Sequence, residues 1–242
     1  MKRSGVKKVT FSPDSPTGAI DFNLPSPSAK NIPEWYKDIP QFLERTPLKA
    51  TILPDSSAVN STIKRCTPFL DAMTAGYMFT TSVDIDVQYQ EQGSPFLRWR
   101  NNATYITLHA SDQHPGLPVP KGYHSQVYKW ENDWQINTPK GYSLLCTHPF
   151  NRLDLPFHTL TGFVDTDNWN VPVQFPFFIQ EGFYGVIPEG TPVAQLIPIK
   201  REEWRSEHQP YNEERSLRLN HSFLKKIERS YKTNWWVKKT YQ

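Results

Sequence analysis

Two Asp-x-Asp pairs have the residue types and the spacing that acid–base or metal chemistry would use. Asp84 and Asp86 lie in Ser82–Tyr89, where apolar and polar residues alternate as in a half-buried strand. This alternation places both carboxylates on the wet face, so we expect a solvated surface there rather than a catalytic pair. Asp165 and Asp167 lie in a short glycine-led segment. On residue type alone, Asp165 suits a turn in which its carboxylate accepts backbone hydrogen bonds between strands.

Histidine and cysteine offer the other reactive groups. A jelly-roll, metal-dependent oxygenase would need His-x-Asp/Glu followed by a distant histidine, and the sequence contains no such motif. The pairs His109 with His114 and His148 with His158 would have to be brought together by folding. The oxygenase therefore remains an alternative, and we predict no metal ligands. Cys146 lies two residues from His148, about 7 Å away along a strand, which is too far for an activated thiol.

Two segments resemble parts of a known enzyme fold. Gly162–Asp167 (GFVDTD) is similar to the glycine-aliphatic-aliphatic-Asp-x-Asp element of trimeric dUTP pyrophosphatases and dCTP deaminases. Pro188–Ile197 (PEGTPVAQLI) is similar to the later glycine turn and the "Ile-Ala-Gln-Leu" strand of the same family, at a fitting separation. The resemblance implies a mainly β chain with a β-clip or jelly-roll-like barrel.

The same resemblance implies a possible active site. In a dUTPase-like nucleotide pyrophosphatase, Asp165 would align the attacking water and Gln195 would help to frame the pocket. Arg152 would bind phosphate, and Asp167 and Trp169 would line the base or sugar. Mg²⁺ would be needed only under this alternative, and we otherwise expect no cofactor.

Several phosphate-binding parts of that family are missing from this chain. A polyphosphate needs several preorganised donors and cations, which the family supplies with an Arg-Ser-Ser turn and a glycine-rich C-terminal arm. Here Pro149–Asp154 holds one arginine and no serine pair, Asn168 replaces an aromatic residue, and Asn234–Lys239 contains no glycine. Because loss of one oxyanion donor costs about 3–4 kcal/mol of transition-state stabilisation, we favour a scaffold without turnover.

A broader resemblance is to an uncharacterised family found in bacteria and phages. It is carried by Cys66–Tyr77, by the Trp-x-Ile-x-Thr-Pro-x-Gly-Tyr run at Trp134–Tyr142, and by Thr147–Arg152. This resemblance spans residues 62 to 204. It implies one domain and a phage origin, without an activity.

Composition favours β-structure with long loops. The 242 residues include 14% aromatics and 22 prolines, and prolines are excluded from central strands and helix interiors. The apolar share of 37% is low, so we expect part of the chain to pack in a hydrophobic core that a partner completes. There is no signal-like apolar run and no 18-residue apolar stretch. We therefore expect a virion or host-cytoplasmic protein that is not secreted and does not contact a membrane.

Turn-forming residues and changes in the residue pattern divide the chain into three predicted parts. Residues 1–61 form an extended proline-rich arm, residues 62–204 the β-barrel domain, and residues 205–242 a basic C-terminal helix or tail. Within the arm, Trp35 and Tyr36 lie between prolines. These two aromatics can pack on their own domain or dock on a neighbouring subunit.

The C-terminal tail combines charge with a helical period. From Lys200 to the end there are 11 Lys and Arg against 6 Asp and Glu. Asn212 can cap a helix, and an apolar residue recurs every four positions in that helix: Leu219, Phe223, Ile227 and Tyr231. We favour packing of this stripe on the domain or a sister subunit. Nucleic acid is the alternative, because basic residues beside Trp235 and Trp236 suit phosphates and bases.

Local patterns also predict individual elements. Thr67–Gly76 should be a short helix that ends at the glycine. Phe96–Arg100 and Thr104–His109 should pair as a hairpin across an Asn-Asn-Ala turn. Further strands are expected at 141–147, 173–179 and 193–199.

Taken together, the patterns favour a non-enzymatic structural or interaction protein of phage type. We expect it to be a homo-oligomer or a virion component, with itself or other virion proteins as partners.

Overall fold

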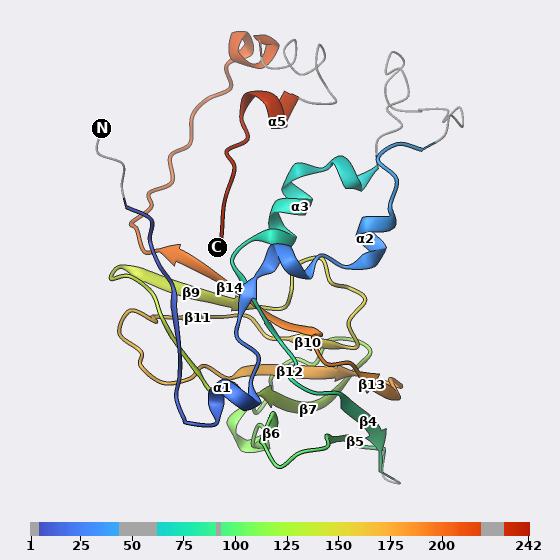
Figure 1. Ribbon diagram of the computed structural model, residues 1–242. Coiled ribbons are helices and arrows are strands. Elements are labelled where there is room, and N and C mark those ends of the chain that lie inside the picture. Colours follow the sequence, from blue (N-terminus) through green and yellow to red (C-terminus); the bar gives the residue numbers. More distant parts are fainter. Residues whose placement is uncertain (1–4, 44–61, 91–92, 219–229) are drawn as a thin grey trace. The chain divides into compact units, whose positions relative to one another are not determined.

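The computed structural model describes residues 5–43, 62–90, 93–218 and 230–242. The chain divides into two compact units, of which one comprises Met1–Asn31, Thr74–Arg201 and Tyr241–Gln242, and the other Ile32–Met73 and Glu202–Thr240. We call the first the sheet unit and the second the helical unit (Figure 1). The predicted boundaries at 61/62 and 204/205 do not coincide with this division.

Among the described residues every strand lies in the sheet unit, and all strand pairs there are antiparallel. Its largest sheet has five strands, in the order β11 (Gly162–Val164), β9 (Tyr142–Thr147), β14 (Pro192–Lys200), β3 (Tyr77–Thr80) and β2 (Ser26–Pro27). A four-stranded sheet has the order β10 (Phe157–Thr159), β12 (Phe175–Gln180), β7 (Tyr123–Trp130) and β6 (Ile106–Leu108).

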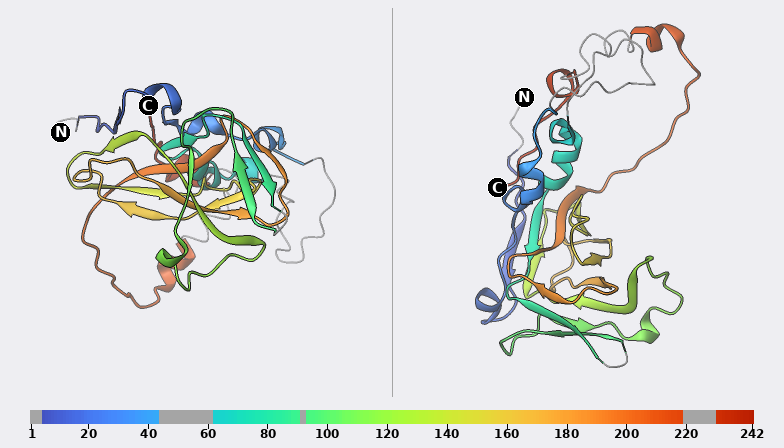
Figure 2. Two further views of the ribbon diagram at one scale, coloured as in Figure 1. Left: turned by 90° about the horizontal axis from the view of Figure 1, so that it is seen from below. Right: turned by 90° about the vertical axis from the view of Figure 1, so that its right-hand side faces the viewer.

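Two smaller sheets complete this unit (Figure 2). One has the order β13 (Gly185–Ile187), β4 (Ile85–Tyr89) and β5 (Pro95–Arg98), and the other pairs β1 (Thr10–Pro13) with β8 (Trp134–Asn137). Short helical turns also occur: α1 (Gly18–Asp21), η1 (Ser28–Asn31) and η3 (Ser111–Gln113). The predicted mainly β class is confirmed.

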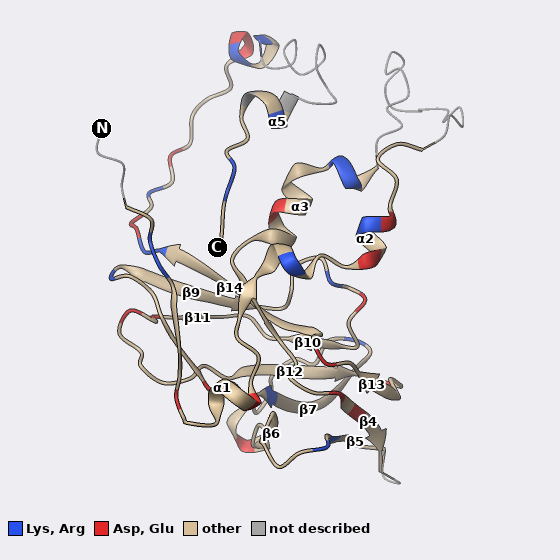
Figure 3. Cartoon of the chain, in the orientation of Figure 1, with Lys and Arg blue, Asp and Glu red and all other residues tan. Residues whose placement is uncertain are grey.

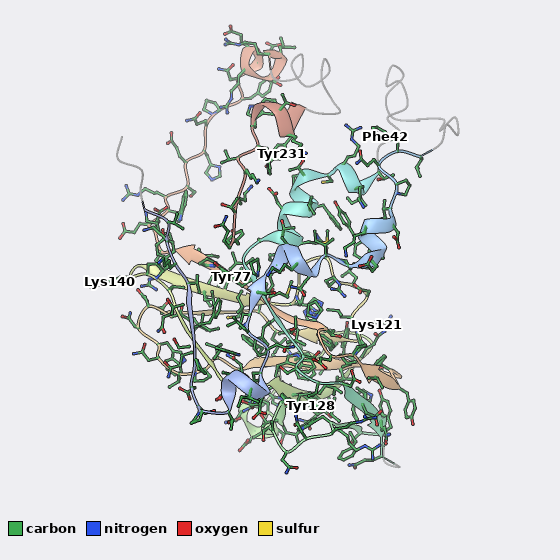
Figure 4. All side chains as sticks on the ribbon, in the orientation of Figure 1. Phe42, Tyr77, Lys121, Tyr128, Lys140 and Tyr231 are labelled. Carbon is green, nitrogen blue, oxygen red and sulfur yellow. The ribbon has the colours of Figure 1, made fainter. Side chains whose placement is uncertain are left out.

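One hydrophobic core joins the sheets. Leu144 and Leu196 of the five-stranded sheet are buried in the same cluster as Ile85 of the three-stranded sheet. Trp130 and Phe177 of the four-stranded sheet stack within it, with ring centroids 4.0 Å apart and planes 10° apart. Tyr128, labelled in Figure 4, lies among these strands and donates a hydrogen bond to the Pro95 carbonyl at 2.8 Å. Aromatic burial on this scale supplies most of the stabilisation of a small β-unit.

Part of the predicted arm belongs to the sheets. Thr10–Pro13 pairs along β8, and Ser26–Pro27 pairs with the edge of β3. An extended, proline-containing segment is suited to such edges, because proline cannot donate to a central ladder.

The strand at 85–89 follows the predicted alternation. Ile85 and Val87 are buried, and Asp86 lies on the wetter face. The predicted hairpin of Phe96–Arg100 with Thr104–His109 is wrong. Its first strand pairs with β4 and its second with β7. The intervening turn exists locally, with Ala103 N donating to Asn101 Oδ1 at 3.1 Å, but it passes the chain from one sheet to another.

The described part of the helical unit contains short helices joined by extended segments. The helices are α2 (Glu34–Asp38), η2 (Ile63–Arg65), α3 (Thr67–Thr74), a helical run over 213–218, and α5 (Ser230–Asn234). The predicted cap is present, since Arg215 N donates to Asn212 Oδ1 at 2.8 Å. Three members of the predicted stripe, Leu219, Phe223 and Ile227, lie outside the described residues.

Gly76 follows α3 with a φ of +67°, as the predicted helix end requires. A Cβ at this position would lie 2.0 Å from the Leu196 carbonyl oxygen in β14. The glycine therefore permits both the turn and the close approach to the central strand.

We predict that Gly76→Ala lowers the free energy of unfolding by about 2–4 kcal/mol, because backbone strain and a backbone clash add. Gly190→Ala is the matched control, since Gly190 also has a positive φ (+79°) but open space around its Cβ position. It should cost only about 1–2 kcal/mol, the strain of a left-handed residue. Urea unfolding measures both, and equal losses would contradict the close-approach argument.

Candidate functional site

The loop after β11 brings Asp165 and Asp167 to the start of β9. The register pairs Val164 with Leu144, so Asp165 lies beside Ser143, whose hydroxyl donates to Asp165 Oδ1 at 2.6 Å. The Gly141 N–H donates to Asp167 Oδ2 at 2.8 Å. We call Asp165–Asp167 the acid loop; it lies at the end of the sheet that Lys140 marks in Figure 4.

Arg201 completes this cluster. It follows β14, whose pairing of Lys200 with Tyr142 delivers it to the same end of the sheet. One guanidinium nitrogen, Nη1, donates to Asp165 Oδ1 at 3.2 Å and to Asp167 Oδ1 at 3.0 Å. The other, Nη2, donates to Asp167 Oδ2. This paired arrangement is a strong, directional form of the Arg–carboxylate contact.

Backbone contacts fix the arginine as well. Its N–H donates to the Gly141 carbonyl at 2.9 Å, and Nη1 also donates to the Tyr142 carbonyl at 3.0 Å. The sequence analysis missed Arg201. The available signal was a cation directly after the last strand of the motif, in register with the glycine turn before β9.

The two aspartates have different environments. The Asp167 side chain is 1% exposed, whereas that of Asp165 is 63% exposed. The hydrogen bonds from Arg201, followed by that from Gly141 N–H, hold the pKa of Asp167 below its usual range. Asp167 in turn raises the pKa of Arg201. Both charges are therefore kept, and they neutralise each other within the chain.

Gln195, the predicted pocket residue, is fully buried in β14. Its Oε1 accepts from Phe150 N at 2.8 Å and its Nε2 donates to the Ala75 carbonyl at 2.6 Å. Along β9 it is in register with Thr147, four residues from Ser143, which is about 13 Å of strand. The structure thus keeps Gln195 away from Asp165.

The remaining predicted ligand residues do not converge either. Arg152 forms a fork with its neighbour Asp154, with Nε–Oδ1 at 2.9 Å and Nη2–Oδ2 at 2.8 Å. Trp169 follows the acid loop in the same turn, where its N–H donates to the Asp165 carbonyl at 3.0 Å, and its ring is exposed. Arg152 therefore already has a carboxylate partner, whereas Trp169 lies beside the acid loop.

The other Asp-x-Asp pair is structural. Asp86 accepts from Arg98 Nη2 at 3.1 Å across the β4–β5 pair. Asp84 Oδ1 accepts from Glu189 N at 2.8 Å. Each carboxylate thus holds a different neighbouring segment.

The thiol and imidazole groups are buried rather than activated. Burial raises the pKa of Cys146 to about 12 and, as the largest cause, lowers that of His148 to about 4. His148 Nε2 bonds the Arg152 carbonyl at 3.0 Å, and Nδ1 accepts from Thr159 N at 3.3 Å. The ring is therefore neutral with its proton on Nε2, and it stacks on His158 at 4.7 Å.

Folding does bring both histidine pairs together. The rings of His109 and His114 meet edge to face, with centroids 5.7 Å apart. Among the described residues, however, no three His, Cys, Asp or Glu side chains converge as a metal site.

Four of the five predicted partner-binding aromatics are described, and all four lie in the helical unit. Tyr36 is buried against Phe69, with centroids 5.9 Å apart, and donates to the Lys64 carbonyl at 3.2 Å. Its ring is therefore part of its own unit's core. Trp35 packs edge-on against Tyr36, whereas Trp235 is exposed. The fourth, Trp236, is half-buried, and the fifth, Phe223, lies outside the described residues.

Neither a protein-family model nor a curated protein matches this chain. In the part of the chain that the structure describes, no helix has the length and apolarity needed to cross a membrane.

We predict that Asp167→Asn lowers the urea midpoint at pH 7. The folded-state pKa of Asp167 is below its unfolded value, so its contribution is present above the ordinary aspartate range and is lost as pH falls through the folded pKa. The gap between variant and wild type should therefore close in strong acid. Asp165→Asn, in the same loop but mostly exposed, is the control and should shift the midpoint less. An Asp167 effect that persists unchanged at low pH would contradict the ion-pair assignment.

Proposed function

We propose that this chain is a non-enzymatic structural or interaction protein of phage type, acting as a homo-oligomer or virion component. The observation that carries the proposal is that groups of the same chain bond both carboxylates of the acid loop. Asp167 is buried and bonded to Arg201 and Gly141, and Asp165 is bonded to Ser143 and Arg201. These groups hold three segments of the sheet unit together, which is a structural role.

The distribution of the other groups supports the same proposal. A nucleotide site needs its donors and cations around one polyphosphate. Here the fully buried Gln195 lies four residues along the strand from the acid loop, and Arg152 is bonded to Asp154. A β-clip or jelly-roll-like arrangement of the two larger sheets is part of the proposal. It is supported by their shared core, to which Leu144, Leu196 and Phe177 contribute.

Nucleoside triphosphates with Mg²⁺ provide the direct test of the missing activity. We expect no release of pyrophosphate or phosphate from dUTP, dCTP or the other triphosphates, as measured by chromatography of the products. Asp165→Asn and Asp86→Asn are the matched pair, since each removes one carboxylate charge, inside and outside the acid loop. Turnover that disappears in Asp165→Asn and persists in Asp86→Asn would overturn the proposal.

Self-association is best placed at the β11 edge. This strand is at the end of the five-stranded sheet, and Phe163 within it is 67% exposed. Trp169 and Val171 are exposed in the loop that follows. An edge strand with unpaired backbone groups and exposed apolar side chains suits addition of a second copy of the chain.

We predict that Phe163→Lys lowers the oligomer mass in light scattering, because a charge at the centre of the joined edge would be desolvated. Tyr184→Lys is the control, since Tyr184 is 70% exposed but lies outside β11. The same mass for wild type and Phe163→Lys, or an equal drop in the control, would count against this edge.

A further inference from the structure

The helical unit contains a cavity of about 560 Å³ lined by basic residues. Its walls include the cations Lys64, Arg65 and Lys232, one carboxylate, Asp71, and the indole of Trp236. Both parts of the unit contribute, since α5 and Trp236, two residues beyond it, line the cavity together with residues of η2 and α3. The volume is within the range of ordinary ligand sites.

The cations are positioned by contacts of their own. Lys64 Nζ donates to the carbonyls of Tyr36 at 2.7 Å and Lys37 at 2.5 Å, which hold the ammonium in place without cancelling its charge. The Arg65 guanidinium lies 4.3 Å from the centroid of the Phe42 ring. Contacts to neutral carbonyls leave the positive charge of Lys64 in place.

Asp71 is the carboxylate among the described residues that line the cavity, and its neighbours engage it. Asp71 Oδ2 accepts from Trp236 Nε1 at 2.8 Å and from Lys239 Nζ at 2.7 Å. Its charge is therefore offset by a lysine beyond the lining residues, and it also orients the indole. The Lys232 ammonium lies 6.0 Å from the centroid of that indole ring, so a cation and an aromatic face lie together.

The charge of the whole chain is also concentrated in this unit. Its residues include 14 Lys and Arg against 11 Asp and Glu, whereas the sheet unit has 13 of each. In the sequence, the net charge of +3 thus falls within the helical unit, and Figure 3 colours the charged residues of its described part. A net positive charge attracts polyanions and speeds their encounter.

We propose that this cavity binds single-stranded nucleic acid. Lys64 and Lys232 contact backbone phosphates, and the oriented indole of Trp236 stacks on a base. Cations with an adjacent aromatic platform are the recurring design of sites that bind single strands without sequence preference. The assignment does not depend on the proposed assembly role, because it rests on a different unit and on different residues.

Fluorescence anisotropy with a labelled dT20 oligonucleotide tests the proposal on the full chain. We expect binding at 50 mM salt that weakens as salt rises. Lys232→Gln should weaken binding about fivefold and reduce the slope of log K against log salt by about 0.7. Lys238→Gln is the matched control, since it removes the same charge from an exposed residue of the same unit that does not line the cavity, and it should bind as the wild type does.

Two tryptophan variants separate stacking from folding. Trp236→Ala should weaken binding about fivefold or more, whereas Trp236→Phe keeps an aromatic face and should retain most of the affinity. Circular dichroism and thermal unfolding report whether either variant keeps its fold. Equal binding by folded Trp236→Ala and Trp236→Phe would overturn the stacking role.

Three other outcomes would also overturn the proposal. They are no oligonucleotide binding at 50 mM salt, equal losses for Lys232→Gln and Lys238→Gln, and binding to phosphatidylserine vesicles in place of the oligonucleotide. Inorganic phosphate distinguishes a simple anion site. If phosphate at constant ionic strength and the same phosphate concentration displaces dT20 as well as unlabelled dT20 does, the cavity recognises the anion and not the strand.

Discussion

The buried amide of Gln195 constrains the sheet unit on both sides of its central strand. An amide removed from water must find hydrogen-bond partners or destabilise the fold by several kcal/mol. Here the partners are the Ala75 carbonyl, just before Gly76, and the Phe150 N–H, in the loop after β9. Through these two hydrogen bonds, the central strand β14 holds the segment that leads into β3 and the segment that follows β9. The next residue, Gly76, has a left-handed conformation and passes against the backbone of Leu196, the residue after Gln195.

The opposite end of β14 is held by the ion pairs of Arg201. Arg201 reaches Asp165, Asp167 and the Gly141 turn, so the acid loop is attached to the strands on which it packs. The segments Gly162–Asp167 and Pro188–Ile197 thus provide the carboxylates and the amide that hold this sheet together. Residue types suited to catalysis can serve as structural cross-links when partners from their own chain occupy them.

Patterns within one element were predictable from the sequence. The burial of Ile85 and Val87 follows from period-two alternation, and the end of α3 follows from the position of Gly76. Pairing between elements was not predictable in the same way. The Asn-Asn-Ala turn has hairpin chemistry, but β5 finds its partner in β4, because burial of the shared core outweighs a local turn preference. Arg201 was missed because it is 34 residues from Asp167 and only the β9–β14 register brings them together.

The balance of charge differs between the acid loop and the basic cavity. In the sheet unit a single guanidinium is shared by two carboxylates, so little positive potential remains for a phosphate at the acid loop. In the helical unit the carboxylate Asp71 accepts from Lys239 and an indole N–H, and three cations line the adjacent cavity. Affinity for a polyanion depends on the local surplus of positive charge rather than on the presence of a familiar motif. By that criterion, the proposed surface for phosphates is the cavity of the helical unit rather than the acid loop.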